Sequence, residues 1–334
     1  MRQAQFPLAV PIDGSPLRWF SVQLQDFGNI GVDVFFALSG FLIYGSLIER
    51  EQSFVPFLAR RVERLYPTFA VVLAATVLLD WGDFWTKRGV LTQALWLVAN
   101  ATMLVGLLPL DPIVFVSWSI SWEIAFYISI PLLISWRGLR DRARSDRIRF
   151  FAVWFAVLVV IPGLQRCAMF VVGIILHEVM RSRQEWINSR GRAIDRWALA
   201  LLVIGGAGVF LLDSRGPLGT LPRTLVLATV VPLVMVAGFA VDGGVARLFS
   251  WRPLRWAGNM SYSYYLLHPW CIVALQKATG WEQRSDAATG AYWQWMAVAF
   301  ATTILGSLVL YLGVEHPLSL ERRFRIPLAR LEHT

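Results

Sequence analysis

Four short polar stretches interrupt the apolar segments of this 334-residue sequence and carry its candidate chemistry. In one of them, SWSISWEIAFY, Ser119, Glu123 and Tyr127 are spaced i, i+4 and i+8, which predicts a polar stripe along an otherwise apolar helix. A carboxyl group in such surroundings must be paired or protonated, and burial raises its pKa toward the range that is useful for proton transfer. We therefore interpret Glu123 as a candidate acid or base, with structural pairing to an arginine as the alternative.

A second stretch, NMSYSYYLLHP, places a histidine within a long apolar run. Ser261, Tyr264, Tyr265 and His268 are spaced i, i+3, i+4 and i+7 and are predicted to share one helical face. Pro269 disfavours helical geometry at His268 and is expected to free a backbone carbonyl there. His268 is thus a candidate for proton transfer, and a hydrogen-bonded structural histidine is the alternative.

A third stretch, FLARRVERLYP, gathers Arg60, Arg61 and Arg64 within about one helical turn. Three guanidinium groups this close repel one another unless an anion lies between them, and the arginine fork matches phosphate geometry. The spacing therefore indicates a phosphate-bearing substrate such as a nucleotide-linked acyl donor. A topogenic cluster, neutralised by Glu63 and lipid phosphates, is the alternative.

The fourth stretch, GVDVFFALSGFLI, holds Asp33, Ser39 and Gly40. Asp33 lies near the predicted start of a helix, where a capping role is the structural alternative to a functional one. The small residues Ser39 and Gly40 are expected to allow close helix packing.

The composition indicates which elements position these side chains. The chain is 56% apolar and only 16% charged, too little polar surface for a water-soluble globular domain. We therefore predict an all-α, polytopic transmembrane bundle. Ten apolar runs approach or reach the spanning length of about 20 residues. They cover 31–48, 66–81, 90–110, 114–136, 150–163, 166–180, 197–212, 221–241, 259–279 and 291–314.

The net charge of +9 comes almost entirely from arginine in short segments between these runs, as the positive-inside rule predicts. Segments 137–149, 181–196, 247–255 and the tail from 315 all fall on one side, which we expect to be the cytoplasm. Segment 49–64 conflicts with this arrangement if all three runs between 66 and 136 cross the membrane. One of those three is therefore predicted to be re-entrant or no span at all.

Several function classes are excluded. The arginines form no basic face with stacking aromatic residues, so we predict no nucleic-acid partner. The motifs G-x-S-x-G, P-loop, H-E-x-x-H and C-x-x-C are absent, and two cysteines are too few for a cysteine-rich metal site, so no metal is predicted. No internal repeat relates the halves, which disfavours a transporter built on repeats.

Taken in order, these stretches resemble the acyltransferase 3 family of integral membrane O-acyltransferases. The resemblance also includes RCAMFVVGIIL and the closing VEHP with Glu315, and it covers about 31–317. It predicts a single membrane domain over 1–334, with an extramembrane leader at 1–30, helices over 31–314 and a basic tail at 315–334. The chain is expected in the plasma (inner) membrane, with its C-terminus in the cytoplasm.

The resemblance implies transfer of an acyl group, usually acetyl, from acyl-CoA to a hydroxyl of a carbohydrate or cell-surface glycan, with no permanently bound cofactor. Membrane lipids and acyl-CoA are the other expected partners. Arg61 and Arg64 would hold the phosphates of the coenzyme, with Arg60 assisting. The candidate catalytic groups are Glu123, His268, Ser119 and Tyr127. Asp33, Ser39, Ser261 and Glu315 are expected to be structural or motif residues.

One departure from the family pattern leaves other functions open. Family members begin with a further spanning helix that carries a basic residue and an essential histidine, and residues 1–30 contain neither the helix nor the histidine. We expect upstream DNA to encode them. A non-catalytic relative is the alternative, as is a transporter or flippase of a small molecule or glycolipid.

Overall fold

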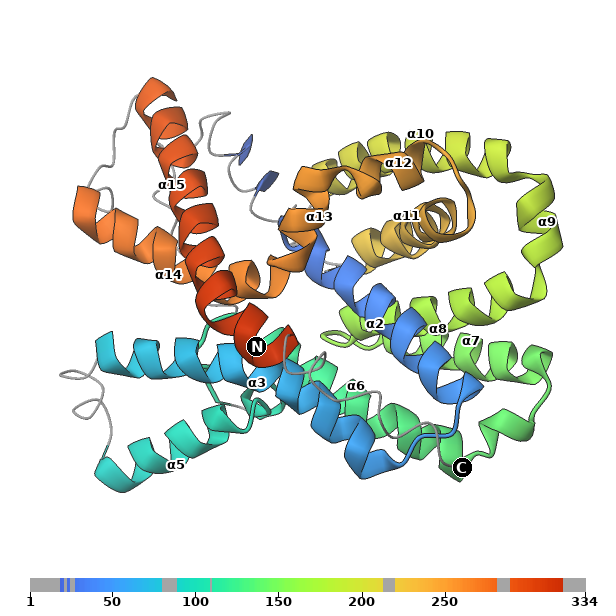
Figure 1. Cartoon of the computed structure of the whole chain (residues 1–334), viewed down its shortest axis with the longest axis horizontal. Coiled ribbons are helices and arrows are strands. Elements are labelled where there is room, and N and C mark those ends of the chain that lie inside the picture. Colours follow the sequence, from blue (N-terminus) through green and yellow to red (C-terminus); the bar gives the residue numbers. More distant parts are fainter. Residues whose placement is uncertain are drawn as a thin grey trace. The chain divides into compact units, whose positions relative to one another are not determined.

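The computed structural model describes residues 19–20, 23–24, 28–79, 89–108, 110–212, 220–280 and 289–320, and every secondary-structure element in these ranges is helical (Figure 1). The long helices are α2 (Ile30–Glu49), α3 (Phe54–Leu79), α6 (Ser117–Trp136), α7 (Arg144–Val160), α8 (Ala168–Ser182), α10 (Gly191–Leu211), α11 (Leu221–Ala240), α14 (Ser261–Thr279) and α15 (Thr289–Leu310). Shorter ones are α5 (Val90–Ala101), η1 (Val105–Leu107), η2 (Leu139–Asp141), η3 (Gln165–Cys167), α9 (Gln184–Ser189), α12 (Gly244–Ser250), α13 (Arg252–Asn259) and the π-helix η5 (Tyr311–Leu320). The all-α prediction is confirmed, and most of 1–30 and all of 321–334 lie outside the described residues.

Six of the described helices are long and apolar enough to cross a membrane, so the prediction of about ten spans is not confirmed. The six are Ile30–Glu49, Phe54–Leu79, Ser117–Trp136, Gly191–Leu211, Leu221–Ala240 and Ala291–Ser319. The predicted runs at 150–163 and 166–180 belong to α7 and α8, with 17 and 15 residues. At about 1.5 Å per residue these helices are shorter than the roughly 30 Å of a hydrocarbon core.

The predicted run at 90–110 does not form one helix. It gives the 12-residue α5, a turn, and then η1. The buried amide of Asn100 explains the turn, because its Oδ1 accepts a hydrogen bond of 2.7 Å from the backbone N–H of Ile113. The indole of Trp96 donates to the carbonyl of Asp111 at 2.8 Å. The segment thus folds back on the chain that follows it, and α5 is about 18 Å long.

The chain divides into two compact units. One, the α2–α8 unit, contains Asp13–Gln52 and Ile128–Trp256, and the other, the α3–α14 unit, contains Ser53–Tyr127 and Ala257–Thr334. Helix α6 passes from the second unit to the first after Tyr127.

Helices α2 and α8 pack closely because glycines line their contact. A Cβ on Gly40 would lie 2.0 Å from the carbonyl oxygen of Phe170, and one on Gly173 would lie 2.0 Å from that of Ala37. The rings of Phe36 and Phe170 stack beside this crossing, with centroids 4.2 Å apart. The close packing predicted at Gly40 is therefore confirmed.

Replacing Gly173 with alanine is expected to destabilise the protein by about 1–3 kcal/mol, because the new methyl group would force two backbones apart. Thermal unfolding of the detergent-solubilised protein measures the effect. The matched control is Gly208→Ala in α10, where a Cβ meets no other atom within 4 Å. That change favours the helix and should leave stability equal or slightly higher. Equal midpoints for the two variants would contradict the close approach of α2 and α8.

Candidate functional site

The α3–α14 unit contains the predicted catalytic and donor-binding residues. Helix α14 packs on α15 and α3, and η5, which continues α15, packs on α3. Four elements of this unit, α3, the first half of α6, α14 and η5, supply the polar side chains of the candidate site.

The polar stripe predicted on α6 is buried. Ser119, Glu123 and Tyr127 are 5%, 2% and 4% exposed. The Tyr127 hydroxyl donates a hydrogen bond to the Glu123 carboxylate, as the i, i+4 spacing predicts. The Ser119 hydroxyl lies 2.6 Å from that of Tyr265, so the stripe is in contact with α14.

The arginines of α3 differ in their surroundings. Arg61 is half-buried, and its guanidinium carbon lies 5.3 Å from the ring centroid of Phe57 and 5.8 Å from that of Tyr127. Both distances are within the range of cation–π attraction. Arg60 and Arg64 are exposed, and the charge of Arg64 interacts with Tyr127 and with Glu315 of η5. The arginine cluster therefore extends from the buried stripe of α6 to the surface of the unit.

His268 is held in a defined orientation. Its Nδ1 lies 3.0 Å from the backbone carbonyls of both Tyr264 and Tyr265, and its ring stacks on that of Tyr264 with centroids 5.3 Å apart. Carbonyl oxygens only accept hydrogen bonds, so Nδ1 carries the proton. The other ring nitrogen, Nε2, then has a free lone pair and can act as a base.

Pro269 explains this orientation. Helix α14 continues through Pro269, which has no N–H to donate to the carbonyl of Tyr265 four residues earlier. The freed carbonyl instead accepts a hydrogen bond from His268. The prediction that Pro269 frees a carbonyl is confirmed, while the expected break in helical geometry at His268 does not occur.

Two further helices of the site, α3 and α6, also contain an internal proline, Pro67 and Pro131. By the same i−4 relation, these prolines remove the helical partners of the carbonyls of Glu63 and Tyr127. Each freed carbonyl lies at or next to a predicted site residue. The sequence thus weakens backbone hydrogen bonding in all three helices at the level of the site.

Glu315 is buried on η5 and joins it to α14. Its Oε2 accepts hydrogen bonds from the backbone N–H and the hydroxyl of Ser263, at 3.1 and 2.5 Å. Ser261, the serine that the spacing singled out, is the first residue of α14 and has an exposed side chain. Ser263 and Tyr262 were not among the predicted site residues. The hydroxyl of Tyr262 donates to the carbonyl of Leu65 at 2.9 Å. Both lie in the quoted SYSYY motif, where hydroxyl groups occur on every face of the helix.

Asp33 and Ser39 belong to the α2–α8 unit, whereas the candidate catalytic and donor-binding residues belong to the α3–α14 unit. Asp33 lies in the first turn of α2, where a negative charge is favourable, and no side-chain cap hydrogen bond is formed at the N-cap residue of this helix. The Asp33 carboxylate is buried and accepts hydrogen bonds from Arg166 at 2.9 and 3.1 Å, and from Arg223 at 3.4 Å. It therefore fixes η3 and α11 to α2, because a buried carboxylate requires a charged partner.

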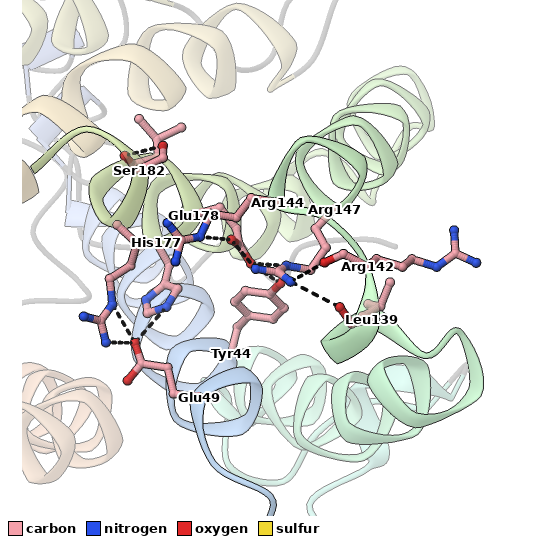
Figure 2. A network of polar contacts seen from close by, with 11 residues as sticks. Tyr44, Glu49, Leu139, Arg142, Arg144, Arg147, His177, Glu178 and Ser182 are labelled. Carbon is pink, nitrogen blue, oxygen red and sulfur yellow. Dashed lines mark hydrogen bonds and ion pairs between the residues drawn. The ribbon is translucent and has the colours of Figure 1, made fainter.

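Glu178 of α8 is a further buried carboxylate, and it was not among the predicted site residues. Figure 2 shows Tyr44 and Arg147 pointing toward it, with hydrogen bonds of 2.5 Å from the tyrosine and 2.7 and 2.9 Å from the arginine. This pairing raises the pKa of Arg147 despite the opposing effect of burial. The signal was present in the sequence, because a carboxylate in the apolar run of α8 is costly unless it has a partner.

The side chains around Glu178 tie three helices together. Tyr44 lies on α2, Arg147 on α7 and Glu178 on α8. Arg147 also donates to the carbonyls of Leu139 and Arg142, at 3.3 and 2.7 Å (Figure 2). We call Tyr44, Arg147 and Glu178 the buried ion-pair network and assign it a structural role.

Comparison with known proteins gives the chemical context of these sites. A protein-family model described as an acyltransferase domain, that of acyltransferase 3, matches residues 5–312. The Bacillus subtilis protein YrhL, whose name provisionally describes a peptidoglycan O-acetyltransferase, is 25% identical over 335 residues, which cover 87% of this chain and 50% of YrhL. The acyltransferase MdmB of Streptomyces mycarofaciens is 26% identical over 339 residues, covering 89% of this chain and 82% of MdmB.

A third relative is the peptidoglycan O-acetyltransferase OatA of Listeria monocytogenes. It is 26% identical over 295 residues, which cover 72% of this chain and 44% of OatA. The chain thus spans about half the length of YrhL and less of OatA. No solved structure matches it. The family match covers nearly the whole chain and includes the segments that carry the candidate site, and the chain belongs to the acyltransferase 3 family.

Proposed function

We propose that this protein is a membrane O-acyltransferase that moves an acyl group, most readily acetyl, from acyl-CoA to a hydroxyl of a carbohydrate such as a cell-surface glycan. The observation that carries the proposal is His268, whose Nδ1–H is engaged by two backbone carbonyls so that Nε2 is left as a base. It lies in the same compact unit as the arginine cluster.

The arginines of α3 suit an acyl-CoA donor. Guanidinium groups bind phosphate oxygens through paired hydrogen bonds, and such charge-assisted bonds are the strong ones. Exposed Arg64 can meet the phosphates of a donor that approaches from water, while Arg61 is preoriented by the rings of Phe57 and Tyr127. Preorientation lowers the entropy lost when the donor binds.

In the transfer step that we propose, Nε2 of His268 takes the proton of the acceptor hydroxyl while the hydroxyl oxygen attacks the thioester carbonyl. The tetrahedral intermediate collapses, the carbon–sulfur bond breaks, and the proton passes to the departing CoA thiolate. Hydroxyl donors stabilise the negative oxygen that forms in between. The paired hydroxyls of Ser119 and Tyr265 are candidates for this role, because Tyr265 lies one turn before His268 on α14.

The helix bounds support a cytoplasmic donor site. With α5 too short to cross the membrane, two crossings, α3 and α6, separate segment 49–64 from segment 137–149. Both arginine-rich segments then fall on the same side, as the positive-inside rule requires. We infer that this side is the cytoplasm of a plasma (inner) membrane protein. We also propose that the 19-residue α14 crosses the membrane together with α15, so that the C-terminus shares this side.

Replacing Arg64 with alanine is expected to weaken acetyl-CoA binding by about tenfold to a hundredfold, since a hydrogen bond to a charged group is worth about 1.5–3 kcal/mol. Turnover at saturating donor should change much less. Titration of the purified protein with acetyl-CoA measures the first quantity and release of free CoA thiol the second. The matched control is Arg149→Ala, which removes an exposed arginine from α7 in the other unit.

The proposed function itself is tested by incubating the full-length protein in membranes with labelled acetyl-CoA and glycan acceptors, and by mass analysis of surface glycans from cells with and without the gene. We expect an acetyl mass that depends on the gene. Donor binding without acetyl transfer to any hydroxyl acceptor would identify a non-catalytic relative and overturn the proposal.

A further inference from the structure

A cavity of about 660 Å³ lies in the α2–α8 unit. None of the residues that line it was assigned to the candidate site. It is lined by residues of α9, the start of α10, the end of α11 and α12. Helices α10, α11 and α12 pack against one another (Figure 1). Three arginines line it, Arg192 and Arg196 from α10 and Arg247 from α12. Such a convergence of guanidinium groups from two helices favours an anionic ligand.

The charge balance of the cavity is positive. The three arginines face two carboxylates, Asp195 and Asp242. Arg192 and Arg196 are exposed and are one turn apart on α10, where like charges repel. Neither forms an ion pair with a described residue. An anion that enters the cavity would therefore relieve this repulsion.

The carboxylate of Asp195 is engaged in holding the wall of the cavity. It accepts hydrogen bonds from the backbone N–H groups of Gly244 and Val245, at 2.7 and 2.9 Å. Gly243 lies so close that a Cβ there would be 2.4 Å from the carboxylate carbon of Asp195. These contacts fix α12, and with it Arg247, against α10.

The position of the cavity in the fold indicates the source of the anion. Helices α10 and α11 are two of the six candidate spans, and the cavity lies where one begins and the other ends, so it is expected at the level of the lipid headgroups. Large exposed aromatic residues, which are typical of the membrane interface, occur near the cavity in the chain: Trp197 on α10 (64% exposed), Phe239 on α11 (56%) and Trp251 directly after α12 (60%). Leu199 and Val241 give the cavity an apolar wall beside its arginines.

We infer that this cavity binds the headgroup phosphate of an anionic phospholipid, with Arg192, Arg196 and Arg247 as its ligands and an acyl chain along Leu199. The guanidinium groups supply donors in the geometry that phosphate oxygens accept, and basic pockets between spanning helices are a recognised form of headgroup site. The inference does not depend on acyl transfer, because its evidence is confined to a cavity in the other unit.

The test is native mass spectrometry of the full-length protein, titrated in detergent with phosphatidylglycerol, with phosphatidylcholine and with inorganic phosphate. The variant is the double substitution R192Q/R196Q, which keeps Asp195 and the α12 contacts. The matched control is R252Q/R255Q, which removes the same charge from α13 in the same unit and outside the cavity. Each arginine near an anionic lipid is worth about 1 kcal/mol, so we expect R192Q/R196Q to weaken phosphatidylglycerol binding by about 30-fold.

The inference is supported if phosphatidylglycerol binds more tightly than phosphatidylcholine and only R192Q/R196Q removes the preference. Equal loss in R192Q/R196Q and R252Q/R255Q would show general charge attraction and overturn it. Displacement of the lipid by millimolar inorganic phosphate would assign the cavity to a soluble anion and would also overturn it. Thermal unfolding without added lipid confirms that both variants are folded.

Discussion

Replacing His268 with glutamine is expected to lower the rate of acetyl transfer by about 10²- to 10⁴-fold, the usual contribution of a positioned acid or base. A glutamine side chain is similar in length and still reaches the carbonyls of Tyr264 and Tyr265, but its amide cannot take a proton from the acceptor hydroxyl. The loss should appear in kcat, with acetyl-CoA binding unchanged, because His268 acts in the transition state. Release of CoA thiol in single-turnover and steady-state assays measures both quantities.

The control for this variant is Tyr264→Phe. It removes a hydroxyl group and keeps the ring that stacks on His268 and the carbonyl that accepts from Nδ1. Its turnover should stay close to that of the unmodified protein. If H268Q retained full turnover, His268 would be a structural histidine and the proton would have to pass to another group, with Glu123 as the next candidate.

Replacing Glu178 with alanine is expected to destabilise the protein by about 3–5 kcal/mol, the typical cost of removing one partner of a buried ion pair. The side chain of Glu178 is 2% exposed and that of Arg147 is 11% exposed, so the guanidinium would lose its partner with little access to water. Tyr44 would lose its hydrogen-bond acceptor as well. The midpoint of thermal or denaturant unfolding in detergent measures the change.

Two further variants separate charge from packing in the buried ion-pair network. Removing both charges together, as Glu178→Ala with Arg147→Met, should restore part of the stability because no buried charge is left unpaired, and Arg144, which also pairs with Glu178, is 47% exposed. Tyr44→Phe removes only the hydroxyl and should cost about 1 kcal/mol. A double variant as unstable as the sum of its single variants would mean that the ion pair contributes nothing beyond its separate side chains.

The spacing of residues in the sequence was sufficient to predict the contacts that form within a single helix. The i, i+4 relation between Glu123 and Tyr127 is a property of helical geometry, and the hydrogen bond between them follows from it. The carbonyl freed by Pro269 has the same origin, because the missing N–H is a covalent feature of proline. Gly40 could be predicted to have a close neighbour, since it lacks a Cβ and lies in an apolar helix, but the sequence did not identify α8 as that neighbour.

The length of an apolar run predicted the membrane-spanning helices less reliably than spacing predicted contacts within a helix. The run at 90–110 is as apolar as a span, yet Asn100 within it pairs with the chain that follows and ends the helix. The mean hydropathy of a long window hides a single polar residue. The conformation of the backbone nevertheless depends on the hydrogen bond that its side chain forms. Composition also predicted a run at 66–81, whereas α3 begins at Phe54 and its first half carries Arg60, Arg61 and Arg64. Residues 66–79 of that run form the second half of the helix.

The sequence by itself determined the membrane class, the helical content and the family, because these depend on composition, periodicity and motif order, which are properties of the chain alone. Tertiary structure alone decided the partners of the buried charges. Asp33 pairs with Arg166, 133 residues away, and Glu178 accepts from Tyr44, 134 residues away. A buried carboxylate must have a partner, but several arginines could satisfy it, and only the packing of the helices determines which one lies within hydrogen-bond distance.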